Sequence, residues 1–227
     1  MSLLLTCAIV ALSSLTPKEW LDPRLDTVDR EAIEEMISFS IPSFDEDVEW
    51  VLQENEEPPV WESFRGKVLV IQTWSNQSAS GRVAPFASQK IIDSLEQKED
   101  VALITLHTPQ GANKAKQFIQ KRKLVVPTAI DHSGETCNHY GVHYDPVTIV
   151  VDRNGAVRHV GLRTRGLSKA IQSLLAEEYD PVLEIDKFIP KSKQTEIAAE
   201  YPIFSSNFGK ATNVQGKKAP SFFVEEW

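Results

Sequence analysis

Hydrophobic residues follow the two patterns that distinguish buried strands from amphipathic helices. Residues 68–74 (VLVIQTW) and 101–108 (VALITLHT) are largely apolar runs bounded by polar and turn residues, which is typical of interior strands. In four other segments the apolar residues recur at helical spacing. These segments, each predicted to be a helix, are residues 29–39, 85–98, 112–123 and 167–179. We expect Asp29 to cap the first of them.

A β-hairpin is predicted over residues 148–162 (TIVVDRNGAVRHVGL). Its turn consists of Asp152, Arg153, Asn154 and Gly155, and an Asn-Gly pair is a strong hairpin signal. The predicted order is therefore strand, helix, strand, helix, hairpin, helix, which is typical of an α/β domain. We expect the first strands to be parallel and the hairpin to be antiparallel.

The chain divides into three predicted parts. Residues 1–40 form an N-terminal helical extension, residues 41–179 form the α/β domain, and residues 180–227 form an irregular, proline-containing linker. At its end the string GKKAPSFFVEEW is similar to SIPSFDEDVEW of residues 40–50, which we expect to be extended. The likeness has two interpretations: chance or a shared edge-strand pattern, or a second copy of the domain that begins at about residue 217.

Composition excludes one class of function and leaves others open. The formal net charge of −8 and the pI of about 5.2 argue against a nucleic-acid binder, which would need a basic surface. Residues 3–12 (LLLTCAIVAL) are apolar but too few to span a bilayer, and they lack the basic start of a signal peptide. We expect this segment to dock on the domain; the alternative is the remnant of an export signal or a membrane-proximal segment.

Three strings together resemble the thioredoxin superfamily, in particular its redoxin/TlpA-like thiol-disulfide oxidoreductases, which are related to AhpC/TSA proteins. The strings are residues 66–74 (GKVLVIQTW), 125–142 (VVPTAIDHSGETCNHYGV) and 140–162. The third matches the family pattern at Tyr140, Gly141, Val142, Pro146, Thr148, Asp152, Arg153, Gly155 and Gly161. The resemblance covers about residues 42–176. It implies a three-layer α/β/α sandwich with a mixed central sheet.

The resemblance also implies a CxxC turn after the first strand, and this chain has no cysteine there. Its two cysteines are Cys7 and Cys137. Three registers are open: the lost pair falls on Ser78 and Gly81, on Gln77 and Ser80, or on Ser75 and Ser78. The degenerate turn therefore consists of Ser75, Asn76, Gln77, Ser78, Ser80 and Gly81. A serine hydroxyl cannot replace the thiolate, and we expect no nearby histidine to act as its base, so the sequence predicts no dithiol-disulfide activity.

Hydroxyl and amide side chains at the expected start of a helix suggest that the turn is kept as a binding surface. The simpler alternative is a solvated turn in which a serine caps the helix. The resemblance places Pro146 opposite the turn as a cis-proline, with Tyr144, Asp145 and Trp74 beside it. The alternative is an ordinary trans Asp-Pro turn. A carboxylate at Asp145 would disfavour acidic peptides.

Cys137 admits three interpretations. It is a small buried hydrophobic residue, a single redox thiol, or, with His139 and His143, part of a zinc or copper site. Because the two histidines flank residues 140–142 at a helix end, we expect them on the surface. The sequence indicates no metal and no cofactor.

These observations favour a non-catalytic binding or scaffold module with a protein or peptide partner, in a longer protein. The alternative is a thiol-disulfide oxidoreductase or peroxide-reducing antioxidant enzyme that works through Cys137 or a downstream domain. A third interpretation is a metal carrier. The resemblance implies a location outside the cytoplasm and a membrane tether in the parent protein, while the sequence gives no oligomeric state.

Overall fold

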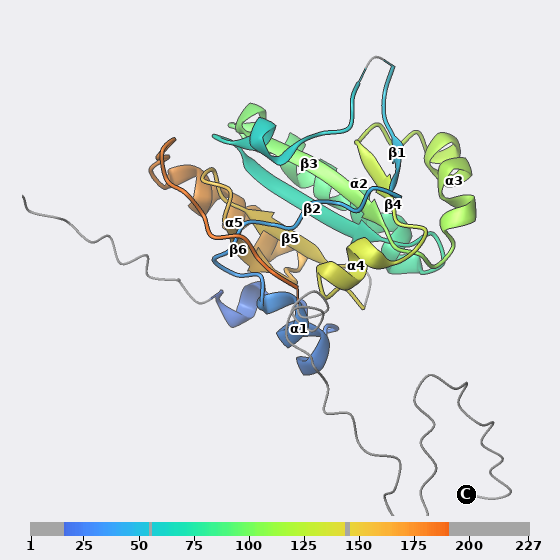
Figure 1. Ribbon diagram of the computed structural model, residues 1–227, viewed down its shortest axis with the longest axis horizontal. Coiled ribbons are helices and arrows are strands. Elements are labelled where there is room, and N and C mark those ends of the chain that lie inside the picture. The colour runs from blue at the N-terminus through green and yellow to red at the C-terminus, as the bar shows by residue number, and fades with distance from the viewer. Residues whose placement is uncertain (1–15, 55, 144–145, 191–227) are drawn as a thin grey trace, which may run out of the picture. The chain divides into compact units, whose positions relative to one another are not determined.

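The computed structural model describes residues 16–54, 56–143 and 146–190, and a six-stranded sheet forms its centre (Figure 1). The strand order is β1-β4-β3-β2-β5-β6. The strands are β1 (Glu49–Val51), β2 (Val68–Trp74), β3 (Val101–His107), β4 (Thr128–Ile130), β5 (Thr148–Val151) and β6 (Val157–Val160). Strands β2, β3 and β4 are parallel, whereas β1, β5 and β6 run antiparallel to their neighbours. The predicted mixed sheet with an antiparallel C-terminal hairpin is confirmed.

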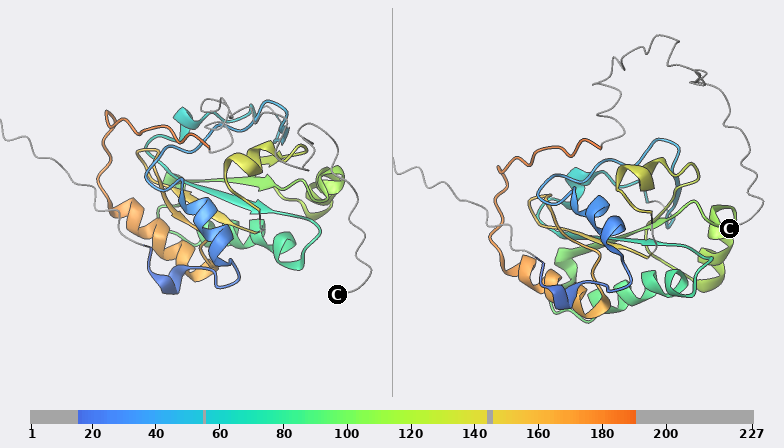
Figure 2. Two further views of the ribbon diagram at one scale, coloured as in Figure 1. Left: turned by 60° about the horizontal axis from the view of Figure 1, so that its bottom comes forward. Right: turned by 90° about the horizontal axis from the view of Figure 1, so that it is seen from below.

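Helices cover both faces of this sheet, which gives three layers (Figure 2). They are α1 (Thr27–Glu34), α2 (Ala79–Asp93), α3 (Ala115–Arg122), α4 (Glu135–His139) and α5 (Thr164–Ala176). Val68 and Val70 of β2 join the cluster that contains Ile92 of α2 and Leu167 of α5. The intervening Leu69 and Ile71 join the cluster on the opposite face, because successive strand residues point to opposite sides.

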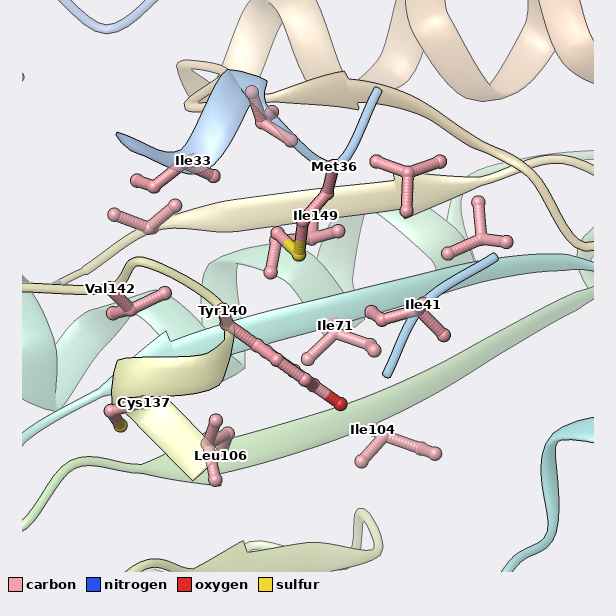
Figure 3. Close-up of a cluster of buried hydrophobic side chains, with 14 of the residues drawn as sticks. Ile33, Met36, Ile41, Ile71, Ile104, Leu106, Cys137, Tyr140, Val142 and Ile149 are labelled. Carbon is pink, nitrogen blue, oxygen red and sulfur yellow. The ribbon is translucent and has the colours of Figure 1, made fainter. Parts of the chain in front are cut away.

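The larger core lies between the sheet, α1 and α4 (Figure 3). Ile33 and Met36 come from the N-terminal part of the chain and have no exposed surface. Tyr140 is also fully buried, and its hydroxyl donates to the carbonyl oxygen of Pro42 at 2.9 Å. Burial raises the pKa of Tyr140 well above its usual value of 10.0. Each buried aliphatic side chain contributes roughly 1.5–3 kcal/mol, so this face is a major source of stability.

The predicted helices exist, but their bounds differ. Helix α1 begins at Thr27, because the side chain of Asp26, not Asp29, caps it by accepting from the Asp29 N–H at 2.9 Å. It ends at Glu34, since the chain then turns through Ser38, with φ of 77°, to pair with Val157 of β6. Two elements differ similarly: the helix predicted over 112–123 starts as a 3-10 turn, and α5 begins and ends earlier than predicted.

Helix α2 was predicted to start at Pro85, and this prediction is wrong. The helix begins at Ala79 because Ser78 caps it, and Pro85 lies inside the helix. Proline in a helix interior removes one N–H donor and is usually disruptive. The start of α2 at Ala79 decides the geometry of the turn that precedes it.

The predicted domain boundaries at 40 and 179 cut through packed structure. The Ser40 N–H donates to the Asp186 carbonyl at 2.8 Å, and the rings of Phe39 and Phe188 lie 6.0 Å apart. Residues up to Pro190 thus belong to the compact unit. Cys7, the apolar residues 3–12, Tyr144, Asp145 and the proposed second copy at 217 lie outside the described residues. Within the described ranges, no helix combines the length and the apolar character that crossing a bilayer requires.

Candidate functional site

The turn of residues 75–78 joins the buried strand β2 to the start of α2. Trp74, the last residue of β2, pairs in register with His107, the last residue of the parallel strand β3. The turn therefore emerges at the carboxyl ends of the central parallel strands. In α/β sheets this edge is the usual location of ligand and active sites.

The start of α2 shows where each of the three predicted registers would place a cysteine pair. Ser78 is the N-cap of α2, and its hydroxyl accepts from the Gly81 N–H at 2.8 Å. A helix N-terminus lowers the pKa of a reactive cysteine, and the register on Ser78 and Gly81 would put its first position at this cap. Gly81 is then the second position. Ser75 is buried at the beginning of the turn, and Gln77 directly precedes the cap.

Gly81 has no room for a side chain. A Cβ atom built on it would lie 2.4 Å from the Ser75 carbonyl oxygen, 2.8 Å from the Ser75 nitrogen and 2.6 Å from the Ser78 hydroxyl. Two of these three atoms are main-chain atoms, which cannot rotate away. A cysteine at this position therefore requires the turn itself to move.

The polar side chains of the turn mainly bind it to the loop that follows β3. Ser75 is fully buried, and its hydroxyl donates to the Gln110 carbonyl at 2.8 Å. The Asn76 side-chain amide donates to the Gly111 carbonyl at 2.9 Å. Gln77 is exposed, whereas Asn76, Ser78 and Ser80 are half-buried. The surface available to a partner is therefore smaller than the sequence suggested.

A histidine, contrary to expectation, lies directly against the turn. His107 is fully buried, and its Nε2 accepts from the Asn76 main-chain N–H at 3.2 Å. Its Nδ1 lies 2.6 Å from the Thr108 carbonyl oxygen. Burial lowers the pKa of His107 to about 4, so the ring is neutral at pH 7. Sequence reasoning missed His107 because it is far from the turn in the chain; its place at the end of a parallel strand was the available signal.

Trp74 and Pro146, proposed as binding residues, lie in different environments. Trp74 has no exposed surface and contacts His107 edge-on at 4.5 Å, so it is a core residue here. Pro146 is half-buried, and the next residue, Val147, exchanges 2.8 Å hydrogen bonds with Thr73. The Pro146 segment thus lies beside the end of β2.

Cys137 lies on α4, in the core cluster between helix and sheet (Figure 3). Its exposed fraction is 4%. His139 is also buried, and its Nδ1 lies 2.8 Å from the Asp45 carboxylate, so the expectation of a surface position is wrong for this residue. His143 is exposed. Across the described part of the chain, no group of three or more His, Cys, Asp or Glu residues could hold a metal ion.

Comparisons with known proteins agree with this architecture. Thiol-disulfide oxidoreductase ResA of Geobacillus thermodenitrificans is 24% identical over 98 residues, which cover 43% of this chain and 55% of the relative. The chain thus spans about half the length of that relative. One solved thioredoxin-like superfamily protein has a TM-score of 0.54 at 20% identity, covering 63% of this chain and 99% of that one. A putative thiol:disulfide interchange protein DsbE from Chlorobium tepidum has a TM-score of 0.50 at 17% identity, with coverages of 62% and 98%.

At these identities the solved structures establish the fold alone, and that fold is thioredoxin-like. The family follows from the sequence match. The chain belongs to the AhpC/TSA family, whose model matches residues 39–160. The resemblance to redoxin/TlpA-like thiol-disulfide oxidoreductases is thereby confirmed.

Proposed function

We propose that this domain is a non-catalytic member of its oxidoreductase family that binds or supports a protein or peptide partner. The observation that carries the proposal is the occupancy of the two cysteine positions. None of the three registers puts a cysteine there, and in the register on Ser78 and Gly81 the second position has no space for a side chain. A cysteine pair in that register would therefore need the turn to move as well.

The chemistry of disulfide exchange supports this proposal. A thiolate must attack a disulfide sulfur, and a second thiolate must leave. A serine hydroxyl has a far higher pKa, and the neutral ring of His107 is engaged through both nitrogens with Thr108 and Asn76. Cys137 is buried on α4, so its sulfur would reach a substrate only if that helix opened.

Insulin reduction and peroxide reduction assays test the absence of catalysis. We expect the wild-type chain and Cys137→Ser to match the rate without protein in both assays. Activity that survives in Cys137→Ser would contradict the proposal. Activity that is lost in Cys137→Ser would contradict it too and would support the alternative, a single-thiol enzyme.

The surface proposed for binding is the solvent-facing part of the turn, formed by Asn76, Gln77, Ser78 and Ser80, with Pro146 beside the end of β2. Its hydroxyl and amide groups suit the main chain of an extended peptide. Titration with peptides, followed through the main-chain amides of residues 75–82, is the test. Amides that do not shift with any peptide would remove the turn as a binding surface.

The context of the domain is part of the proposal. The likeness of residues 216–227 to residues 40–50 supports a second redoxin copy in the parent protein. The parent gene would then encode a GK-apolar-W-C-x-x-C string downstream of Trp227. A location outside the cytoplasm, with a membrane tether, rests on the family resemblance alone. Fractionation of cells that express the full gene tests it.

A further inference from the structure

The turn is held at its centre by a hydrogen bond to a titratable ring. His107 has no exposed surface, and its Nδ1 lies 2.6 Å from the Thr108 carbonyl oxygen. A carbonyl oxygen can only accept, so the Nδ1 atom carries the ring proton. Nε2 of the neutral ring is then an acceptor, and the Asn76 main-chain N–H donates to it at 3.2 Å.

Asn76 is the residue through which this bond controls the turn. Its side-chain amide donates to the Gly111 carbonyl at 2.9 Å, and its own carbonyl accepts from the Arg82 guanidinium at 3.1 Å. The fit against Gly111 is close, because a Cβ built there would lie 2.1 Å from Asn76 Oδ1. Asn76 therefore links β3, the loop after it and the start of α2.

We propose that His107 is a pH-sensitive switch that holds the turn closed when its ring is neutral and opens the turn when Nε2 takes up a proton. A protonated ring has a donor on each nitrogen. Its Nε2–H would face the Asn76 N–H, so that hydrogen bond is lost and the Nε2–H of a buried cation is left without an acceptor. That state is disfavoured unless the turn moves and admits water.

The surroundings of His107 determine where the switch operates. Burial lowers the pKa of His107 to about 4, and the positive charge of His132 lowers it further, whereas the Thr108 carbonyl opposes the shift. Asp131 contacts His107 through its main chain, donating its N–H to the His107 carbonyl at 3.0 Å. On the turn side, the Arg82 guanidinium donates to the Asn76 carbonyl. The neighbouring Trp74 ring carries no charge.

The inference deepens the proposed function and rests on it for its meaning, since the turn that opens is the surface proposed to bind a partner. Acid would then release a partner from the turn. The pH-dependent opening itself does not depend on a partner, because the His107–Asn76 hydrogen bond is present without one.

An NMR titration of the full ¹⁵N-labelled chain between pH 7 and pH 3.5 tests the switch. At neutral pH we expect the His107 ring to be protonated on Nδ1 only. On acidification, the Asn76 amide and the His107 ring should shift together with one midpoint below 6.5, the usual pKa of histidine, and before the amides of β2 change. In His107→Gln, whose side-chain oxygen can accept from Asn76 without titrating, the Asn76 shift should be absent.

His132→Gln is the matched control, because it removes an exposed histidine near His107 and should keep the coupled shift. The switch is wrong if the Asn76 amide keeps its midpoint in His107→Gln, or if turn and β2 amides change in one unfolding step. Should His107→Gln not fold, a neutral wild-type ring protonated on Nε2 would overturn the inference by itself. Insulin reduction by the chain would end the proposed function and leave this result standing.

Discussion

Two polar turns of this domain follow buried strands and are held in different ways. In the β5–β6 hairpin, the Asp152 carboxylate accepts from the main-chain N–H groups of Asn154 and Ala156 at 2.9 and 3.0 Å. These partners are two and four residues away in the chain. The β2–α2 turn instead depends on His107, Gln110 and Gly111, which are 31 and 35 residues from their partners.

Both turns receive contacts from distant residues, as when the Gly66 N–H donates to the Arg153 carbonyl at 2.9 Å, but the hairpin turn also has its own Asp152 carboxylate to hold two of its main-chain N–H groups. A locally held turn is specified by its own residues, and its conformation survives changes elsewhere. A turn held by tertiary contacts keeps its shape only while the second loop stays in place. Polar residues in the β2–α2 turn thus serve the fold first, and only their solvent-facing atoms remain available for a partner.

The largest expected effect is a loss of stability in acid, because each region contains one buried histidine. Burial lowers the pKa of His107 and of His159 on β6 to about 4, while an unfolded histidine titrates near 6.5. The unfolded chain therefore binds more protons as the pH falls below 6.5. By pH 4 the free energy of unfolding should drop by roughly 3 kcal/mol per histidine.

Urea denaturation at pH 7 and at lower pH values measures this loss. His107→Gln and His159→Gln should each remove about half of the pH dependence between 6.5 and 4.5, where most carboxylates remain ionised. An equal pH dependence in wild type and both variants would show that neither ring is buried in its neutral form. If the pH dependence is reduced in His159→Gln but unchanged in His107→Gln, the turn around His107 is already open at neutral pH.

The next largest effect is the loss of stability when a glycine is replaced by alanine, compared between the β2–α2 turn and the hairpin. Gly81→Ala should lower the free energy of unfolding by about 3 kcal/mol, because its Cβ would lie 2.4 Å from the Ser75 carbonyl oxygen. Gly155→Ala should cost only about 1 kcal/mol. Gly155 has φ of +91°, but the atom nearest to its new Cβ is 3.7 Å away. Equal losses in denaturant melts would show that the turn yields as readily as the hairpin.

The sequence predicts the features that depend on neighbouring residues and misses those that depend on residues distant in the chain. Residues 68–74, 101–108 and 148–162 give their strands, because apolar runs and an Asn-Gly turn are local signals. The start of α2 was wrong because Pro85 is a strong local signal that Ser78 and the packing of α2 override. At the site, the sequence itself shows that the turn contains no cysteine. The sequence could not show the contact with His107 or the lack of space at Gly81, because both depend on residues that the fold brings together.

The smallest expected effect on stability is that of removing the hydroxyl of the helix cap, Ser78, compared with that of Ser80 nearby. The Ser78 hydroxyl accepts from the Gly81 N–H at 2.8 Å, so Ser78→Ala should cost about 1 kcal/mol, as loss of a helix cap usually does. Ser80 lies in the first turn of the helix, and its hydroxyl only approaches that of Ser78, at 3.5 Å. Ser80→Ala should therefore change stability by less than about 0.5 kcal/mol. Parallel denaturant melts of the two variants decide the point: if Ser78→Ala costs no more than Ser80→Ala, tertiary contacts alone fix the start of α2.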